Sequence, residues 1–189
     1  LSADLTVNGE GGQDVVTITG NMNLSGHALM VNAEEITVNS GVTVSAGDIE
    51  LDATAVVGTP ITPDNLPVAN VQAAINIDNA ELNGSNVILS ASATLVSDVV
   101  NLPLLPNASL AADVSAEIAV TGNSDINATG IFTAEALSTV FSTAVATAVA
   151  GLGVPEIGAA ATLINNTARS RLSDNTTVTA GGAVMVDAT

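Results

Sequence analysis

The sequence has no cysteine, no tryptophan and no tyrosine, and Phe132 and Phe141 are its only aromatic residues. The absence of cysteine excludes a disulfide framework and a thiolate metal site, and it is compatible with an exported bacterial protein. Aromatic side chains normally supply much of the bulk of a globular core. Because 47% of the residues are hydrophobic and nearly all of these are aliphatic, we expect a narrow, regular interior filled by small side chains.

Basic residues are almost absent as well. Arg169 and Arg171 are the only two among 189 residues, against 19 acidic residues, and the formal net charge is −17. This charge excludes nucleic-acid binding through a basic patch and disfavours attraction to anionic membranes, although it can recruit cations. We find no apolar run long enough to span a membrane and no signal peptide at the start. Because the first residue is Leu1, we expect a processed chain or a part of a longer one.

Short segments of alternating hydrophobic and polar residues follow one another from Ala28 onward. The segments "ALMVNAE", "EITVNSG", "VTVSAG" and "DIELDAT" are each typical of a short strand that ends at Gly, Asn or Ser. The triplet at 31–33, "VNA", recurs as "LDA" at 51–53, 20 residues later, with room for three strands in between. Three short strands in such a period are typical of one coil of a parallel β-solenoid.

The same signature returns at growing intervals. "LDATA" at 51–55, "LSASA" at 89–93, "FTAEA" at 132–136 and "VDA" at 186–188 align at spacings of 38, 43 and 54 residues. Insertions at about 54–74, 94–115 and 137–163 separate them, and these insertions hold every proline of the chain. Proline and glycine near their middles, with alternating runs on both sides, favour a hairpin or an extended loop.

These patterns predict an all-β protein, a right-handed parallel β-solenoid (β-helix) with hairpin or long-loop insertions at one corner of the later coils. We expect one continuous domain, with minimal coils over 1–53 and coils that carry long insertions over 54–189. Stacking of the coils would place the signature residues in two inward columns. The first column would hold Leu51, Leu89, Phe132 and Val186, and the second Ala53, Ala91, Ala134 and Ala188.

The insertion that contains "EALSTVFSTAVATAVAG" is rich in alanine, so a helix over 135–150 is the alternative to a strand. Threonine and valine at alternate places favour the strand. Leu137 and Phe141 would then lie on one side of the strand, and Ala144 and Ala146 on the other. A strand with two fairly apolar faces is typical of a position between packed layers.

Residues 141–189 carry the elements "NNTARSRL" and "NTTVTAGG", followed by an alternating strand that ends in alanine. This stretch resembles a repeat of giant bacterial surface proteins, the filamentous-haemagglutinin-like and autotransporter-like repetitive adhesins. The resemblance extends loosely over the repeat frame from Val31 onward. It implies a rod-like β-solenoid on or outside a bacterial cell with a role in adhesion or matrix, and it brings no catalytic residues with it.

Arg169 and Arg171 have the same parity in a strand, so both would point to one side. Ala168, Ser170 and Leu172 would form the inner set, which leaves the arginines on the outside of an acidic rod. One interpretation is local charge balance against neighbours such as Asp174 or Asp125, which contributes little to stability. The other is a contact with an acidic surface or a partner subunit.

Asp48, Glu50 and Asp52 alternate with hydrophobic residues, so three carboxylates would share the outer face of one strand. Asn32 and Glu34 of the preceding coil would lie next to them. Calcium takes several oxygen ligands, so a calcium site is one interpretation. Residues two apart in a strand are separated by about 7 Å, too far for all three carboxylates to hold one ion, so a solvated acidic face is the other.

Three further motifs have weaker support. "GGQDVVTIT" at 11–19 is similar to a calcium-binding nonapeptide, but it lacks the second glycine pair and does not recur. His27 has no partner at metal-ligand spacing and is expected to be an exposed turn residue. Acceptor triplets for N-glycosylation, which matter only in a glycosylating secretory route, begin at Asn23, Asn83, Asn107, Asn127, Asn165 and Asn175.

The function that we expect is an extracellular structural or adhesive repeat module of a bacterial surface protein or filament, without enzymatic activity. A carbohydrate-binding or carbohydrate-active β-helix protein is the alternative. A carbohydrate-active enzyme needs paired acids or a cation site in a groove with aromatic or basic residues, which are scarce here. An ice-binding solenoid would repeat Thr-x-Thr in every coil, and the middle coils lack it.

The expected partners follow from the end of the chain. "GGAVMVDAT" is a strand that needs a next coil, so we expect head-to-tail self-association or continuation into further solenoid repeats. A cell-surface or glycan ligand would fit an adhesive role. We expect neither nucleic-acid binding nor membrane insertion.

Overall fold

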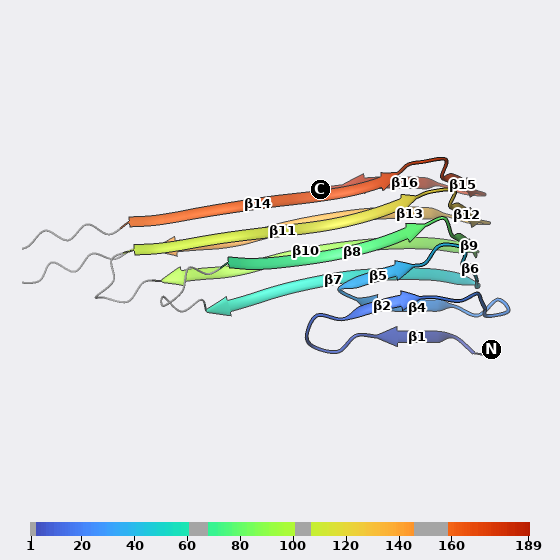
Figure 1. Ribbon diagram of the computed structural model, residues 1–189, viewed down its shortest axis with the longest axis horizontal. Coiled ribbons are helices and arrows are strands. Elements are labelled where there is room, and N and C mark those ends of the chain that lie inside the picture. The colour runs from blue at the N-terminus through green and yellow to red at the C-terminus, as the bar shows by residue number, and fades with distance from the viewer. Residues whose placement is uncertain (1–2, 61–67, 101–106, 146–158) are drawn as a thin grey trace, which may run out of the picture.

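The protein is a parallel β-solenoid, as the alternating sequence predicts. A computed structural model describes residues 3–60, 68–100, 107–145 and 159–189. In these residues the chain forms sixteen strands and no helix. Every strand pairing is parallel and joins equivalent positions of successive coils, so the backbone hydrogen bonds run along one axis (Figure 1).

The strands form three sheets, which we call A, B and C, and the chain visits them in that order in each coil. Sheet A contains β1 (Leu5–Asn8), β4 (Leu29–Ala33), β7 (Asp48–Pro60), β10 (Asn86–Val100), β13 (Phe132–Val145) and β16 (Val184–Ala188). Sheet B contains β2 (Val15–Ile18), β5 (Glu35–Val38), β8 (Val68–Asp78), β11 (Asn107–Thr121) and β14 (Ala159–Leu172). Sheet C contains β3 (Met22–Asn23), β6 (Thr43–Ser45), β9 (Glu81–Gly84), β12 (Asp125–Ala128) and β15 (Thr177–Ala180).

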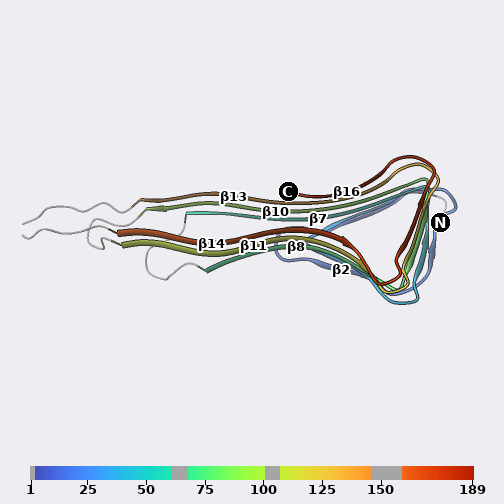
Figure 2. The same cartoon turned by 90° about the horizontal axis from the view of Figure 1, so that it is seen from above.

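The three sheets enclose a triangular body, and a long arm leaves it at the corner between sheets A and B (Figure 2). The first coils have short strands and no arm, whereas β7, β8, β10, β11, β13 and β14 each have 11 to 15 residues. The expected insertions therefore all lie at one corner of the later coils. The N-terminus and the C-terminus lie at opposite ends of the stack (Figure 1).

The arm is a two-layered continuation of sheets A and B. Its outgoing and returning limbs pair with the matching limbs of neighbouring coils and not with each other. Thr94 of β10, for example, has Val56 and Thr139 as its register partners in sheet A. Small and branched side chains, among them Ala93, Leu95 and Val114, are buried between the layers. The arm is thus part of the same hydrophobic core as the triangular body.

The register of β13 differs by two residues from the one that the repeated signature in the sequence predicts. The first inward column contains Leu51, Leu89, Ala134 and Val186, and Phe132 stacks on Val87 instead. The predicted positions of Phe132 next to Leu89 and of Ala134 next to Ala91 are therefore wrong, although the inward orientation of both is right. Ala136 takes the predicted place of Ala134 in the second column. Because side chains in a strand alternate with period two, a shift of two residues keeps every residue on the expected face.

The alanine-rich segment forms a strand as far as the structure describes it. β13 runs from Phe132 to Val145, and the remainder of the alternative helix, 146–150, lies outside the described residues. Its outer face is not covered by another layer, because Leu137 is 40% exposed and Phe141 is 63% exposed. The expectation of a strand between two packed layers is therefore wrong for this face.

Successive coils touch through their backbones at the corner between sheets C and A. A side chain at Gly47 would overlap the carbonyl oxygen of Gly26, and one at Gly181 would overlap the carbonyl oxygen of Thr129. The turns are also joined along the axis, since the amide of Gly130 donates to the carbonyl of Ser85 at 2.6 Å. Glycine is required here because any Cβ would push the coils apart.

Candidate functional site

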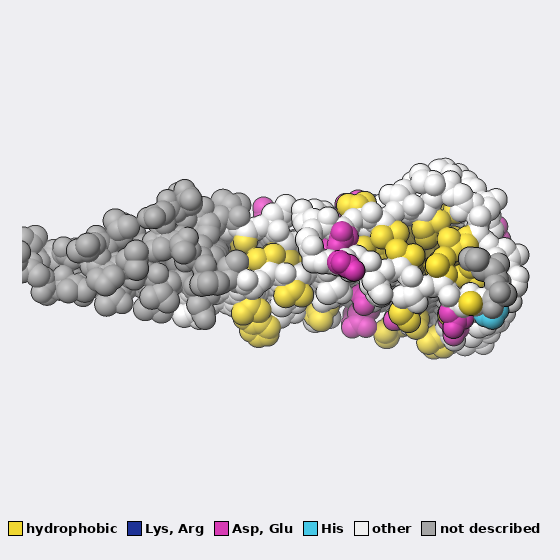
Figure 3. All heavy atoms as spheres, turned by 90° about the horizontal axis from the view of Figure 1, so that it is seen from below, with side chains coloured by type: hydrophobic (Ala, Val, Ile, Leu, Met, Phe, Trp, Pro, Cys, Tyr) yellow, Lys and Arg dark blue, Asp and Glu magenta, His cyan; other side chains and the backbone are white. Residues whose placement is uncertain are grey.

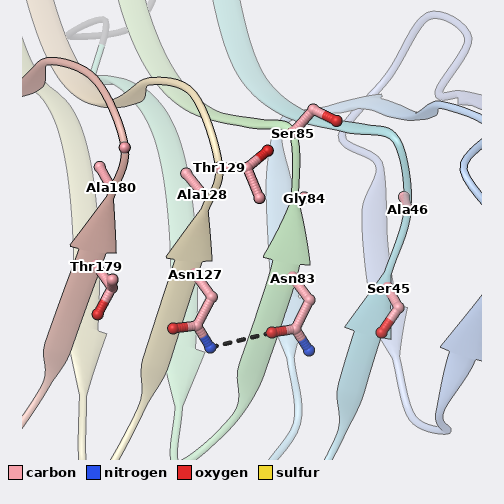
Figure 4. A pocket seen from close by; sticks show the side chains of 11 residues that line it. Ser45, Ala46, Asn83, Gly84, Ser85, Asn127, Ala128, Thr129, Thr179 and Ala180 are labelled. Carbon is pink, nitrogen blue, oxygen red and sulfur yellow. Dashed lines mark hydrogen bonds between the residues drawn. The ribbon is translucent and has the colours of Figure 1, made fainter.

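A hollow lined by small residues, several of which carry hydroxyl or amide groups, lies on this corner between sheets C and A. It is an open groove of about 700 Å³ that follows the solenoid axis over β6, β9, β12 and β15 and the turns after them (Figure 4). Its lining consists only of small and uncharged residues. These are Ser45, Ala46, Asn83, Gly84, Ser85, Asn127, Ala128, Thr129, Thr179, Ala180 and Gly181.

Four of these residues form a ladder along the groove. Ser45, Asn83, Asn127 and Thr179 occupy the same outward position in successive strands of sheet C. Asn127 Nδ2 donates to Asn83 Oδ1 at 3.0 Å, so the two amides point toward each other, as Figure 4 shows. Asn83 Nδ2 in turn donates to Glu81 Oε1 at 3.0 Å, which fixes the orientation of both amides.

Much of the hydrogen-bonding capacity of the groove is unused within the described part of the chain. The hydroxyl groups of Ser45, Ser85, Thr129 and Thr179 form no hydrogen bond there, and neither does Asn127 Oδ1. Because a hydroxyl both donates and accepts, these groups can meet either kind of partner. The arrangement offers hydrogen bonds to a ligand and brings no nucleophile next to a base.

The groove is an uncharged strip on a strongly acidic protein. None of its lining residues is charged, although the chain has 19 acidic residues. Two carboxylates border it, since Glu81 and Asp125 are register partners in the neighbouring outward column of sheet C. Glu81 Oε2 also accepts a bond from Thr43 Oγ1 at 3.4 Å. The border repels anions, while the strip itself carries no charge of its own.

The predicted calcium residues lie elsewhere, on the outer face of sheet A. Asp48 Oδ1 accepts bonds from the backbone amide of Asn86 at 3.2 Å and from its side chain at 2.9 Å. Glu50 stands between Met30 and Ile88 in register, so no carboxylate lies beside it in either neighbouring strand.

Asp52 has Asn32 and Ser90 as its register partners and accepts a bond from Thr54 Oγ1 at 3.0 Å. Glu34 lines one small hollow together with Asn32 and Asp52, as the sequence predicts, and its Oε2 accepts a bond from the amide of Asp14 at 2.8 Å. Within the described ranges, no three acidic or histidine side chains form a group that could hold a metal ion. Calcium at Asp48, Glu50 and Asp52 stays a prediction without geometric support.

Arg169 and Arg171 point outward from β14, as their parity predicts. Both are exposed, whereas Ala168, Ser170 and Leu172 are half-buried. Ser170 Oγ reaches across to the carbonyl of Ala134 at 3.2 Å, which confirms the inner set.

The carboxylate nearest to Arg169 in register is Glu117 of β11, while Arg171 faces Ala119. The neighbours expected from the sequence were Asp174 and Asp125. Neither arginine forms an ion pair in the part of the chain that is described. A contact with a partner stays a prediction.

The remaining motifs are placed as follows. His27 lies in the turn before β4, with a side chain that is 41% exposed, and its Nδ1 is 3.5 Å from Asp4 Oδ1. The nonapeptide-like segment contributes β2 to sheet B. Among the glycosylation triplets, Asn23, Asn83 and Asn127 fall in one outward column of sheet C, which also contains Ser45.

Sequence reasoning did not find the groove. Its signal was present, because "LNGSNV" at 82 and "INATGI" at 126 recur at equivalent places in the repeat. This recurrence predicts a strand followed by a turn, and it does not show that the polar side chains line a groove. Their polar side chains become neighbours through stacking of coils, which joins residues that are 44 positions apart, from Asn83 to Asn127.

No family model, no curated protein and no solved structure matches this chain. In the described residues we also find no helix with the length and hydrophobicity that crossing a membrane requires.

Proposed function

We propose that this chain is a non-enzymatic structural or adhesive module of an extracellular bacterial surface protein or filament. The observation that supports this proposal most directly is the strictly parallel pairing of successive coils. In the stack of described strands, each sheet has an edge strand at both ends with which a further strand can pair. A module of this kind extends a rod, and its acidic surface keeps the rod soluble.

The two ends of the stack present complementary edges. β1, β2 and β3 are the edge strands at one end, and β16, β14 and β15 are the edge strands at the other. At the first end an opening of about 280 Å³ is lined by Val7, Val16, Ile18, Met22, Leu29 and Val31, among others. Figure 3, seen from this end, has hydrophobic side chains in the wide part of the molecule.

The opposite end exposes inward residues of the last coil. Val184 is 53% exposed and Val186 is 42% exposed, although both belong to inward columns of sheet A. Contact between the two ends would bury both apolar surfaces and pair their strand edges. The net charge of −17 opposes this contact, and salt screens that repulsion.

Association of the isolated chain tests the proposal. We expect light scattering and negative-stain microscopy to show rods that lengthen as the salt concentration rises. Val186→Lys places a charge in the apolar end and should shorten the rods. Met185→Lys is the matched control, because Met185 is the adjacent residue, is 45% exposed and faces outward. Compact single particles at high protein and salt concentration would contradict end-to-end extension.

Carbohydrate binding is a second candidate function, and the groove on sheet C favours it. The lining offers amides and hydroxyls but no carboxylate. Glu81 and Asp125 stand on an open outer face beside the groove, and bond cleavage by paired acids requires them to flank the scissile bond. The arrangement therefore supports a binding surface more than a hydrolytic one.

A further inference from the structure

We propose that the groove lined by Ser45, Asn83, Asn127 and Thr179 binds a neutral, linear oligosaccharide laid along the solenoid axis. This inference rests on the adhesive form of the proposed function, because it names the chemical class of ligand that such a module would hold. The lining residues come from four successive coils.

The chemistry of the lining matches that of a sugar. A neutral sugar presents hydroxyl groups that both donate and accept hydrogen bonds. The groove presents hydroxyls at Ser45, Ser85, Thr129 and Thr179 and the acceptor Asn127 Oδ1, none of which is used within the described residues. Polar groups that have no internal partner and line a hollow are the ones that a ligand can satisfy without breaking existing bonds.

The groove is linear, and its lining residues repeat along the direction in which the sugar chain would lie. Strands in a sheet are spaced by about 4.8 Å, so the three steps from Ser45 to Thr179 cover roughly 14 Å. This length accommodates several sugar rings in a row. A compact ligand would use only one or two steps of the ladder, whereas a linear chain can meet all four.

Two side chains of the groove and the turns behind it are held in place before any ligand arrives. Asn83 and Asn127 are held by their mutual bond and by the bond from Asn83 to Glu81. The turns behind them are joined by backbone bonds, including the amide of Gly181 to the carbonyl of Ala128 at 3.0 Å. A ligand therefore loses little conformational entropy in ordering these two amides and the turns. Glycine at 181 permits this close approach of the turns, because a Cβ there would collide with the backbone of Thr129 in the preceding coil.

Charge selects a neutral ligand over an acidic one. The lining is uncharged, but Glu81 and Asp125 run beside it and the whole chain carries −17. An acidic oligosaccharide would meet like charges along the border and find no arginine in the groove. The absence of an aromatic platform and the open shape predict weak binding at one groove, which repeated modules on one rod would strengthen through avidity.

Mapping by NMR tests the proposal on the whole, isotopically labelled chain. The neutral probes are cellohexaose, maltohexaose and linear mannohexaose, and the acidic probe is a hyaluronan hexasaccharide, all at millimolar concentration. We expect at least one neutral probe to shift the amide signals of groove residues such as Gly84, Asn127 and Thr179, and the acidic probe to shift them less. The proposal fails if no neutral probe shifts these signals, if the shifts gather on another face, or if the acidic probe binds as tightly.

Two substitutions then locate the contact. Thr179→Val keeps the shape of the side chain and removes a hydroxyl that has no internal partner, and we expect it to weaken binding about fivefold. Thr177→Val is the matched control, because Thr177 lies two residues away on the same outer face of β15 but does not line the groove. Equal affinity of the two variants would overturn the assignment, and their far-UV circular dichroism should match that of the parent chain.

Failure of this inference is distinguishable from failure of the proposed function. Rod formation depends on the end coils and leaves the groove open along the side of the stack. Rods without sugar binding would therefore remove the ligand and keep the structural role. Sugar binding by single particles that never lengthen would do the opposite.

Discussion

Val87 on β10 and Phe132 on β13 are register partners, and both side chains are fully buried. Phe132 is the bulkiest of the fully buried side chains in the described residues, in an interior otherwise filled by alanine, valine, leucine and isoleucine. The next inward pair along the same strands, Leu89 with Ala134, combines a large and a small residue. At the contact between β10 and β13 a large side chain thus lies beside a smaller one in both pairs, which is compatible with close packing.

Replacing each of the two phenylalanines by alanine compares the effect of a buried and of an exposed side chain on the free energy of unfolding. Phe132→Ala leaves a cavity in the buried column, and we expect the free energy of unfolding to fall by about 3–5 kcal/mol. Phe141→Ala removes a side chain that is 63% exposed, and we expect a change within about 0.5 kcal/mol. Urea unfolding followed by circular dichroism measures both. Similar losses for the two variants would contradict the placement of β13.

A second pair of variants compares Gly47, at the corner between sheets C and A, with Gly58 on β7. Gly47→Ala would drive a Cβ into the carbonyl oxygen of Gly26, and we expect a loss of about 1–3 kcal/mol from overpacking. Gly58→Ala on β7 meets no atom within 4 Å, so we expect unchanged or slightly higher stability. Thermal unfolding of both variants checks the contact between coils. A harmless Gly47→Ala would show that the coils are further apart than described.

Two buried serines of the arm are predicted to respond in opposite directions. Ser97 is 1% exposed, and its hydroxyl has no hydrogen-bond partner in the described residues, so Ser97→Ala should raise the melting temperature. The Ser138 hydroxyl donates to the carbonyl of Val114 at 3.4 Å and also contacts Asn166 across the layers. Ser138→Ala should therefore cost about 1 kcal/mol. A lower melting temperature for Ser97→Ala would indicate a partner for that hydroxyl.

Trypsin offers a test of β14, because Arg169 and Arg171 are its only cleavage sites in the chain. Both lie near the C-terminal end of β14, in the part that pairs with β11 up to Leu172, so cleavage requires local opening of the sheet. We expect native protein to be cut far more slowly than the same chain in urea that leaves trypsin active, as followed by mass spectrometry. Rapid cleavage of the native protein at these sites would place them in a loop.

The class of fold and the face on which each strand residue lies can be predicted from the amino-acid pattern alone. Alternation with period two assigns Ala168, Ser170 and Leu172 to the inside and Arg169 and Arg171 to the outside without knowledge of the strand partners. The predicted repeat of 20 residues from Val31 to Leu51 is confirmed, because the two residues are register partners. These features are local, and a solenoid repeats a local pattern, so they could be read from the chain.

Which strands pair, and in what register, becomes known only from the three-dimensional arrangement of the coils. Alternation is unchanged by a shift of two residues, so it could not distinguish Ala134 from Phe132 as the partner of Leu89. Alternation also does not show which strands pair with each other, so the two limbs of the arm could not be assigned to sheets A and B. The groove depends on this register most of all, because Ser45, Asn83, Asn127 and Thr179 come from four coils separated by insertions of unequal length. These four residues become neighbours only when the coils stack, and the sequence does not show which positions of different coils lie next to one another.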